Sequence, residues 1–415
     1  MEKYNLVVVG GGLSGVAAAI SGARQGLKTL LVEKAGWLGG AMSNCLIYPF
    51  MPFWTTVNGE KRYLSKGIFA EMLERQRSYA DIKKEIYFNP EYFKLVLDEM
   101  VQESGADILF HTTLSRVKTD NRKITSVFFS TKGGEMEVCA DFFVDATGDG
   151  DLFAFAGCDF QLGREKDGLC QPMTICFRMN NVDDKLFNEE IESIQNLYKE
   201  WQQQGKILNP RENILYFREL GDGVIHFNTT RVVKHDPTNP FDLSRAEIIG
   251  RKQIFELVEL LKKHTKAFAK SELLSVAAEI GVRESRKLKG EHILTVEELK
   301  NCTVFEDSIA CGNYEIDIHN PEGAGTSHYF FKSGEFYTIP YRSLVPKEYD
   351  NLLVAGRCIS ATHEAQASIR IMPICACLGQ AAGLASAVAY KDSCAVKAVD
   401  IDKLHALLTD CGAIF

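Results

Sequence analysis

The sequence predicts an α/β protein: a Rossmann-like domain, with a parallel sheet and an antiparallel β-meander, and an inserted α+β domain. Three observations support this. Residues 5–9 (NLVVV) form an apolar run, followed at once by the glycine-rich segment 10–15 (GGGLSG) and an alanine-rich helix pattern. Residues 108–143 hold short β-rich runs separated by Asp120-Asn121 and Gly133-Gly134. Residues 160–340 mix isolated strand patterns with polar helices.

The N-terminal segment is expected to be a βαβ unit. The strand at 5–9 is apolar throughout, as in a parallel strand buried on both faces. The helix is expected to run to about Gln25, where Gly26 ends it, and residues 27–33 (LKTLLVE) are expected to form the next strand.

The rest of the chain divides into recognisable patterns. Helices are expected near 68–79, 90–103 and 401–411, and the meander over 112–118, 123–131 and 135–146. In the middle, strands at 173–179 and 223–228 mix with helices at 184–204 and 244–270, and 351–356 (NLLVAG) reads as another buried strand. We therefore expect a first domain part at 1–160, an inserted substrate domain at 161–340, and the return to the first domain at 341–415.

Composition excludes several classes of protein. Of 415 residues, 46% are hydrophobic and 25% are charged, and the net charge is −8. An acidic chain has no electrostatic footprint for nucleic acid. The twelve irregularly spaced cysteines, without a C-x-x-C, predict a reducing cytoplasm and no disulfide framework. No signal peptide is expected, because residues 1–4 lead straight into a strand, and no metal is expected, because the histidines are scattered.

Residues 371–390 are uncharged and long enough to span a bilayer. Pro373 near the start, Gln380 in the middle and many small residues favour a buried helix instead. We therefore expect no membrane span.

The segment 10–15 predicts a dinucleotide site. Gly10 allows a tight turn, Gly12 lets the backbone approach a pyrophosphate, and Gly15 lets helix and strand pack closely. The helix N-terminus offers free N–H groups to the phosphates. Glu33, at the end of the next strand, is placed to accept the ribose hydroxyls. The cofactor is then NAD or FAD.

Further contacts favour FAD. The segment 39–43 (GGAMS) follows Glu33 closely, 145–150 (DATGDG) closes a distant strand, and Gly356-Arg357 closes another. A long cofactor lying across a sheet needs such contacts. No second Gly-x-Gly-x-x-Gly motif follows a predicted strand, so a separate NAD(P)H domain is not expected.

These segments, together with 281–292 (GVRESRKLKGEH) and 339–383, resemble FAD-dependent oxidoreductases of the glutathione-reductase superfamily, on the branch with fumarate-reductase-like flavoproteins. The resemblance covers both ends of the chain and little of residues 180–270. It implies FAD stretched across the first domain. The residues it assigns to the cofactor are Gly10, Gly12, Leu13, Ser14, Gly15, Glu33, Lys34, Gly40, Ala41, Met42, Ala146, Thr147, Gly148, Asp149, Arg357, Gly379 and Gln380. Many relatives have an acidic residue where Arg357 stands, so a phosphate contact is the alternative role for this arginine.

Flavin carries the hydride chemistry, and the protein supplies position and charge. The N-terminus of the helix after Pro373 is expected to stabilise negative charge at flavin N1 and O2. Arg283 and Arg370 are candidates to bind a substrate carboxylate, and His363 or Tyr341 to exchange a proton.

The sequence thus predicts an FAD-dependent oxidoreductase that oxidises or reduces a small organic substrate by hydride transfer at flavin N5, with carboxylates as one candidate class. Its electron partner is expected to be dioxygen, a quinone or a redox protein. Two alternatives are an NAD-dependent dehydrogenase and a flavoprotein that uses FAD without net redox turnover.

Overall fold

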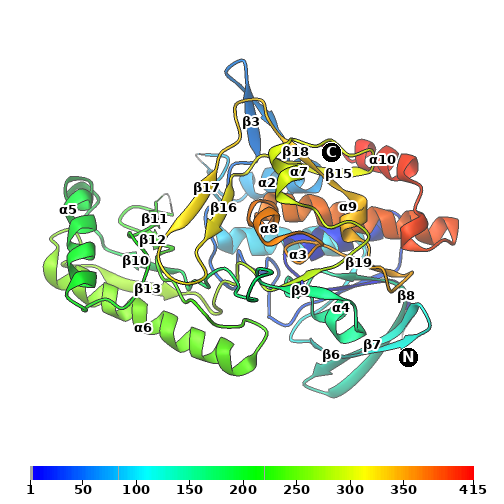
Figure 1. Cartoon of the computed structure of the whole chain (residues 1–415), viewed down its shortest axis with the longest axis horizontal. Helices are drawn as coiled ribbons and strands as arrows, with labels where there is room; N and C mark the ends of the chain where they lie inside the picture. Colours follow the sequence, from blue (N-terminus) through cyan, green and yellow to red (C-terminus); the bar gives the residue numbers. More distant parts are fainter. Residues whose placement is uncertain (1–2, 83, 219) are drawn as a thin grey trace.

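The computed structural model describes residues 3–82, 84–218 and 220–415, and Figure 1 shows two bodies side by side. The larger body holds both ends of the chain, so blue, cyan, orange and red elements lie together in it. The smaller body, in green, comes from the middle of the chain. Each body has its own hydrophobic core.

The larger body is built on a seven-stranded sheet. Its strands are β1 (Lys3–Val9), β2 (Thr29–Val32), β5 (Asp107–Leu109), β6 (Thr113–Asp120), β7 (Lys123–Thr131), β8 (Gly134–Asp145) and β19 (Leu352–Val354). Strands β5, β2, β1, β8 and β19 are parallel neighbours, and β7 and β6 follow β8 in antiparallel order. The long β8 joins the two parts, because its first half pairs with β7 and its second half with β1 and β19. The predicted parallel sheet with a β-meander is confirmed.

Two helices pack together beside the strands, α1 (Leu13–Arg24) and α9 (Met372–Asp392). A Cβ at Gly379 would lie 1.9 Å from the carbonyl oxygen of Ser14, and one at Gly383 would lie 2.3 Å from that of Ala18. Only glycine permits so close an approach of two backbones. By length and composition α9 could cross a membrane, but 94% of its most apolar window is buried inside the protein. Such burial is typical of a core helix.

Shorter elements complete the larger body. The helices are α2 (Ile68–Arg77), α3 (Pro90–Ser104), α4 (Asp151–Ala156), α7 (Val296–Lys300), α8 (His363–Ile369) and α10 (Ile401–Asp410), with 3₁₀ turns at Tyr341–Leu344 and Val396–Ala398. The paired strands are β3 (Trp54–Val57) with β4 (Glu60–Tyr63), β9 (Phe160–Leu162) with β14 (Arg286–Leu288), β15 (Ser308–Gly312) with β18 (Tyr337–Pro340), and β16 (Ile316–His319) with β17 (Thr326–Tyr329).

The smaller body is a four-stranded antiparallel sheet packed on two long helices. In order, its strands are β11 (Tyr216–Phe217), β12 (Ile225–Phe227), β10 (Phe177–Asn180) and β13 (Glu272–Val276), and the helices are α5 (Asp184–Gln203) and α6 (Pro240–His264). Its core residues all lie between Met173 and Ile280. The strands β15 and β18 instead contribute to the core of the larger body. The division at residues 160 and 340 stays a prediction.

The helix expected at 244–270 begins and ends earlier than predicted. The side chain of Asn239 accepts hydrogen bonds from the backbone N–H groups of Phe241 and Asp242, and Pro240 occupies the first turn. This cap moves the start of α6 to Pro240.

Candidate active site

The glycine segment forms a cradle at the end of β1. Gly10 has φ +104°, and a Cβ there would lie 2.4 Å from the carbonyl oxygen of Ala146. A Cβ at Gly15 would lie 1.7 Å from the carbonyl oxygen of Gly10. No side chain caps the N-terminus of α1. The buried hydroxyl of Ser14 has no hydrogen-bond partner among the described residues. The orphaned hydroxyl and free N–H groups fit a bound phosphate.

Glu33 and the 39–43 segment close around this cradle. The carboxylate of Glu33 accepts hydrogen bonds from Gly11 N (2.6 Å) and Ala35 N (2.8 Å). Gly12 and Gly39 form an isolated parallel bridge, and a Cβ at Gly40 would lie 2.8 Å from the Cα of Gly12. The two glycine loops therefore meet, as a single elongated ligand requires.

The neighbouring side chains that were assigned to the cofactor differ in their exposure to solvent. Leu13 and Met42 are buried, whereas Ala41 is exposed. Lys34 pairs with Glu279 at 3.0 Å.

The DATGDG segment lies against Gly10 of the cradle. Asp145 accepts hydrogen bonds from the backbone N–H of Thr147 (3.0 Å), the hydroxyl of Thr147 (2.7 Å) and the backbone N–H of Phe153 (2.9 Å). Burial nevertheless raises the pKa of Asp145 to about 6. Arg357 donates to Asp149 Oδ1 (2.8 Å) and to Ser285 Oγ (3.0 Å), beside Gly148. Burial alone would raise the pKa of Asp149, but Arg357 and Ser285 lower it.

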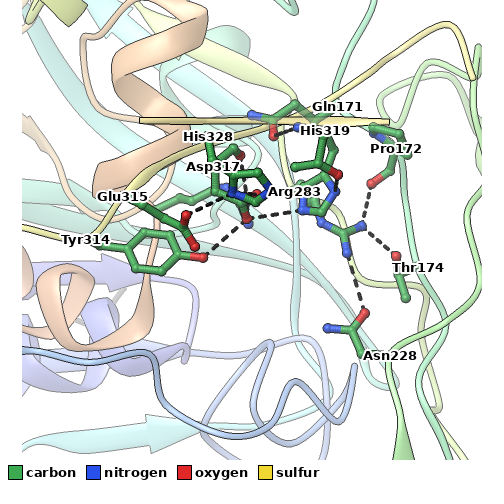
Figure 2. A network of polar contacts seen from close by, with 12 residues as sticks. Gln171, Pro172, Thr174, Asn228, Arg283, Tyr314, Glu315, Asp317, His319 and His328 are labelled. Atoms are coloured by element: carbon green, nitrogen blue, oxygen red, sulfur yellow. Dashed lines mark hydrogen bonds and ion pairs between the residues drawn. The ribbon is translucent and has the colours of Figure 1, made fainter. Parts of the chain in front are cut away.

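A second group of charged residues lies where β16, α8 and the smaller body meet. Arg283 donates to the carbonyl oxygen of Pro172 (2.7 Å), to Thr174 Oγ1 and to Asn228 Oδ1 (3.4 Å), which are neutral groups. Figure 2 shows these partners, with Asp317 and His319 beside the arginine. Burial, together with Arg370 and Arg211, lowers the pKa of Arg283 to about 9. A partly buried guanidinium whose partners among the described residues are neutral favours a bound anion.

Positive charge exceeds negative charge around Arg283. Arg370 is 3.3 Å from Asp317 Oδ2, and Arg231 is 3.1 Å from Glu212. Arg211 is buried, and its Nε and Nη1 have no partner among the described residues. The group therefore holds four arginines and two carboxylates, which we call the arginine cluster: Arg211, Arg231, Arg283, Arg370, Glu212 and Asp317.

His319 is held rigidly within the cluster. Its Nε2 is 3.2 Å from Asp317 Oδ2 and its Nδ1 is 3.1 Å from Nη2 of Arg231. Because arginine can only donate, Nδ1 accepts and Nε2–H donates to Asp317. Burial and Arg283 lower the pKa of His319 well below its usual value. His319 is therefore a neutral positioning group.

His363 belongs to a different buried network. Its Nδ1 lies 2.7 and 2.9 Å from the two carboxylate oxygens of Glu284, which also binds Lys287 Nζ (2.5 Å) and the backbone N–H of Gln171 (3.0 Å). Burial alone would raise the pKa of Glu284, but His363 and Lys287 lower it. The ring lines a cavity of about 780 Å³ that also includes Thr326, a neighbour of His319. Among the described residues Nε2 has no polar partner, so it can exchange a proton there.

The sequence matches the family model described as FAD dependent oxidoreductase over residues 5–408, nearly the whole chain. The chain belongs to this FAD-dependent oxidoreductase family. The cofactor is therefore FAD, and the orphaned Ser14 hydroxyl and paired glycine loops fit it. The match favours the FAD-dependent prediction over the NAD-dependent alternative.

Individual relatives of this FAD-dependent oxidoreductase match short stretches. It is 57% identical to the mitochondrial dihydrolipoyl dehydrogenase of Schizosaccharomyces pombe over 42 residues, 10% of this chain and 8% of that enzyme. It is 43% identical to the glycerol-3-phosphate dehydrogenase of Synechocystis over 63 residues, 15% of this chain and 10% of that enzyme. The chain thus matches about a tenth of the length of these curated relatives.

A solved structure matches over nearly the whole oxidoreductase. It is a geranylgeranyl bacteriochlorophyll reductase-like protein from Thermoplasma acidophilum, with a TM-score of 0.50 and 14% identity, covering 99% of this chain and 84% of that one. At 14% identity this match shows that the two proteins share a fold.

The structure separates the predicted catalytic residues of the oxidoreductase. Arg283 and Arg370 come together at Asp317, whereas His363 lies at the opposite end of α8 from Arg370, about 10 Å away along the helix axis. Tyr341 lies in the core of the larger body, and its hydroxyl donates to the carbonyl oxygen of Val396 (2.7 Å). We therefore remove Tyr341 from the candidate site.

Two predicted cofactor residues have other roles. Gly379 lies against Ser14 in the α1–α9 contact, and Gln380 accepts a hydrogen bond from the backbone N–H of Ile68 (3.2 Å) at the start of α2. Both contribute to packing. No group of three or more His, Cys, Asp or Glu side chains within 3–82, 84–218 and 220–415 could hold a metal ion.

Sequence reasoning missed several residues of the site: Glu212, Arg211, Arg231, Glu284, Asp317 and His319. The alternation of Asp317 and His319 along β16 was a usable signal. For Arg211 and Arg231 no local motif was available.

Proposed function

We propose that this FAD-dependent oxidoreductase oxidises or reduces a small organic acid, whose carboxylate is bound by Arg283 and Arg370. The observation that carries the proposal is the partly buried guanidinium of Arg283, whose hydrogen-bond partners among the described residues are all neutral oxygens. A carboxylate at this position would supply the missing counter-charge through charge-assisted hydrogen bonds.

Each part of the chain has a role in this scheme. FAD, when bound, supplies hydride transfer at N5. The backbone of residues 10–15 and the Ser14 hydroxyl hold the pyrophosphate, Glu33 binds the adenosine ribose, and the start of α9 approaches the flavin. The arginine cluster binds and orients the acid, and His319 keeps Asp317 in place between the arginines.

His363 is the proposed proton-transfer residue. Glu284 accepts the Nδ1–H, which leaves the Nε2 lone pair directed to the cavity. Because α8 separates His363 from Arg370 by about 10 Å, the substrate must be extended, or one ordered water must bridge the gap.

We further propose that the chain belongs to the fumarate-reductase-like branch of the glutathione-reductase superfamily and acts in the cytoplasm. Its residues 161–340 form the substrate domain. Electrons then pass to or from dioxygen, a quinone or a redox partner protein.

The test is anaerobic titration of the holoenzyme with a panel of organic acids and with matched neutral amides, following flavin absorbance. We expect a subset of acids to bleach the oxidised flavin, or to reoxidise the reduced flavin, while the amides do neither. Equal reaction of acids and amides would refute the role of the arginines.

A further inference from the structure

One face of the sheet in the smaller body carries a row of polar side chains whose buried nitrogen and oxygen atoms have no partner among the described residues. Arg178 on β10 stands opposite His226 on β12 and opposite Ser275 on β13. Among the described residues no hydrogen-bond partner is present for Nε and Nη2 of Arg178, for either ring nitrogen of His226, or for the hydroxyl of Ser275. Buried polar groups are almost always paired, so three neighbours without partners indicate a ligand.

The row faces away from the core of the smaller body. Phe177, Met179 and Phe227 alternate with the polar residues along β10 and β12 and belong to that core. Side chains alternate between the two faces of a strand. The polar row therefore looks toward the larger body, where the ring of Tyr48 lies 5.5 Å from that of His226.

The row is positively charged and has no counter-ion among the described residues. Burial lowers the pKa of Arg178, and the charge of Glu91 offsets this only in part. Arg178 and Glu91 form no ion pair among the described residues. His226 is fully buried, and burial with the nearby Arg178 lowers its pKa to about 3. A neutral imidazole can donate one hydrogen bond but cannot neutralise the positive charge of the arginine. A buried cation without a counter-ion is costly unless an anion binds.

This row continues the face that contacts Arg283. Asn228 accepts a hydrogen bond from Arg283 and lies two residues beyond His226. Asn228 directly follows β12, and Arg178 and Arg283 both act electrostatically on the thiol of Cys176, so the two cationic groups lie near the same buried residue.

We propose that Arg178, His226 and Ser275 form a second anion subsite, which binds the distal acidic group of an elongated organic substrate whose first carboxylate lies at Arg283. The inference rests on the proposed function, since it extends the same substrate site. It assigns the substrate to the class of organic acids with two separated acidic groups.

The experiment uses the oxidised holoenzyme. The α,ω-dicarboxylates from succinate to sebacate are titrated beside monocarboxylates of matched length, with perturbation of the flavin absorbance as the readout. We expect an optimum at an intermediate dicarboxylate, which binds at least about tenfold more tightly than its monocarboxylate. A matched ω-phosphonocarboxylate distinguishes a distal phosphate from a distal carboxylate by its relative affinity.

The decisive variant is Arg178→Met, with Arg251→Met as the control, because Arg251 is on α6 and pairs with Glu247 at 2.8 Å. Arg178→Met should lower the affinity of the best dicarboxylate to that of its monocarboxylate and leave monocarboxylate binding unchanged. The control should bind all ligands as the parent does. If Arg178→Met loses FAD, His226→Leu provides the same comparison.

The outcomes separate the two proposals. Unchanged dicarboxylate binding in Arg178→Met, with binding lost in Arg283→Met, would overturn the second subsite and leave the proposed function standing. Acid binding that is insensitive to both changes would overturn both.

Discussion

Arg357 and Asp149 form a partly buried ion pair, 2.8 Å from Nη2 to Oδ1, beside Gly148. The resemblance indicates that many relatives have an acidic residue where this chain has Arg357. In this chain Arg357 instead pairs with the carboxylate of Asp149, from a distant segment.

The pair predicts opposite effects of two substitutions on FAD binding. Arg357→Met leaves Asp149 as an uncompensated anion close to the pyrophosphate, so we expect FAD affinity to fall at least about tenfold. Asp149→Asn frees Arg357 to face the phosphates, so affinity should stay or increase. Titration of the apoproteins with FAD gives both Kd values. Equal weakening in both variants would mean that the pair acts only as a structural unit.

The contact between α1 and α9 predicts a stability effect. Gly379→Ala places a Cβ 1.9 Å from the carbonyl oxygen of Ser14, so the two helices must separate. We expect a loss of about 1–3 kcal/mol, seen as a lower thermal midpoint, and a lower FAD content, because Ser14 belongs to the cradle. Gly133→Ala is the control, since its nearest neighbour would be 3.7 Å away. Similar midpoints for the two variants would contradict the tight contact.

Much of the fold could be predicted because its signals are local. The run at 5–9, the glycines at 10–15 and the turns at 120–121 and 133–134 identify strand, cradle and meander within short windows. The arginine cluster could not be predicted in this way. Arg211, Asp317 and Arg370 are far apart in sequence, and only the packing of β16 and α8 against the smaller body brings them together. The many small residues of 371–390 predicted a closely packed helix, but the contact of Gly379 and Gly383 with α1 could not be read from sequence.

Arg283 predicts a specific loss of substrate binding. Arg283→Met removes the guanidinium while keeping much of the bulk of the side chain, and we expect kcat/KM to fall by about 10²-fold, mainly through KM. Arg342→Met is the matched control, because Arg342 is half exposed and pairs with Asp307 at 2.9 Å outside the cluster. Steady-state rates over substrate concentration separate the two parameters. A fall in kcat with unchanged KM would show that Arg283 acts in a step after substrate binding.

His226 predicts a dependence of stability on pH. Its pKa in the folded protein is about 3, below the value near 6.5 expected in the unfolded chain. The unfolded state therefore binds more protons between these values, and stability present above pH 6.5 is lost as the pH falls. His226→Leu removes this effect.

Between pH 6.5 and 5, the parent should lose about 2 kcal/mol of unfolding free energy relative to His226→Leu. Urea unfolding at the two pH values measures the difference. Parallel curves at both pH values would show that His226 titrates normally in the folded state.

The network of Glu284 and His363 predicts chemical rescue. His363→Gly should lower kcat by about 10²-fold with KM nearly unchanged, because the proton-transfer group is removed while the arginine cluster is kept. The deletion opens onto the cavity of about 780 Å³, so added imidazole can occupy the vacated place. We expect imidazole to restore much of kcat in His363→Gly and to leave the parent unaffected. Glu284→Gln, which keeps the shape but removes the charge that holds Nδ1–H, should lower kcat less and should not respond to imidazole. A rise in KM without rescue would instead assign His363 to positioning α8.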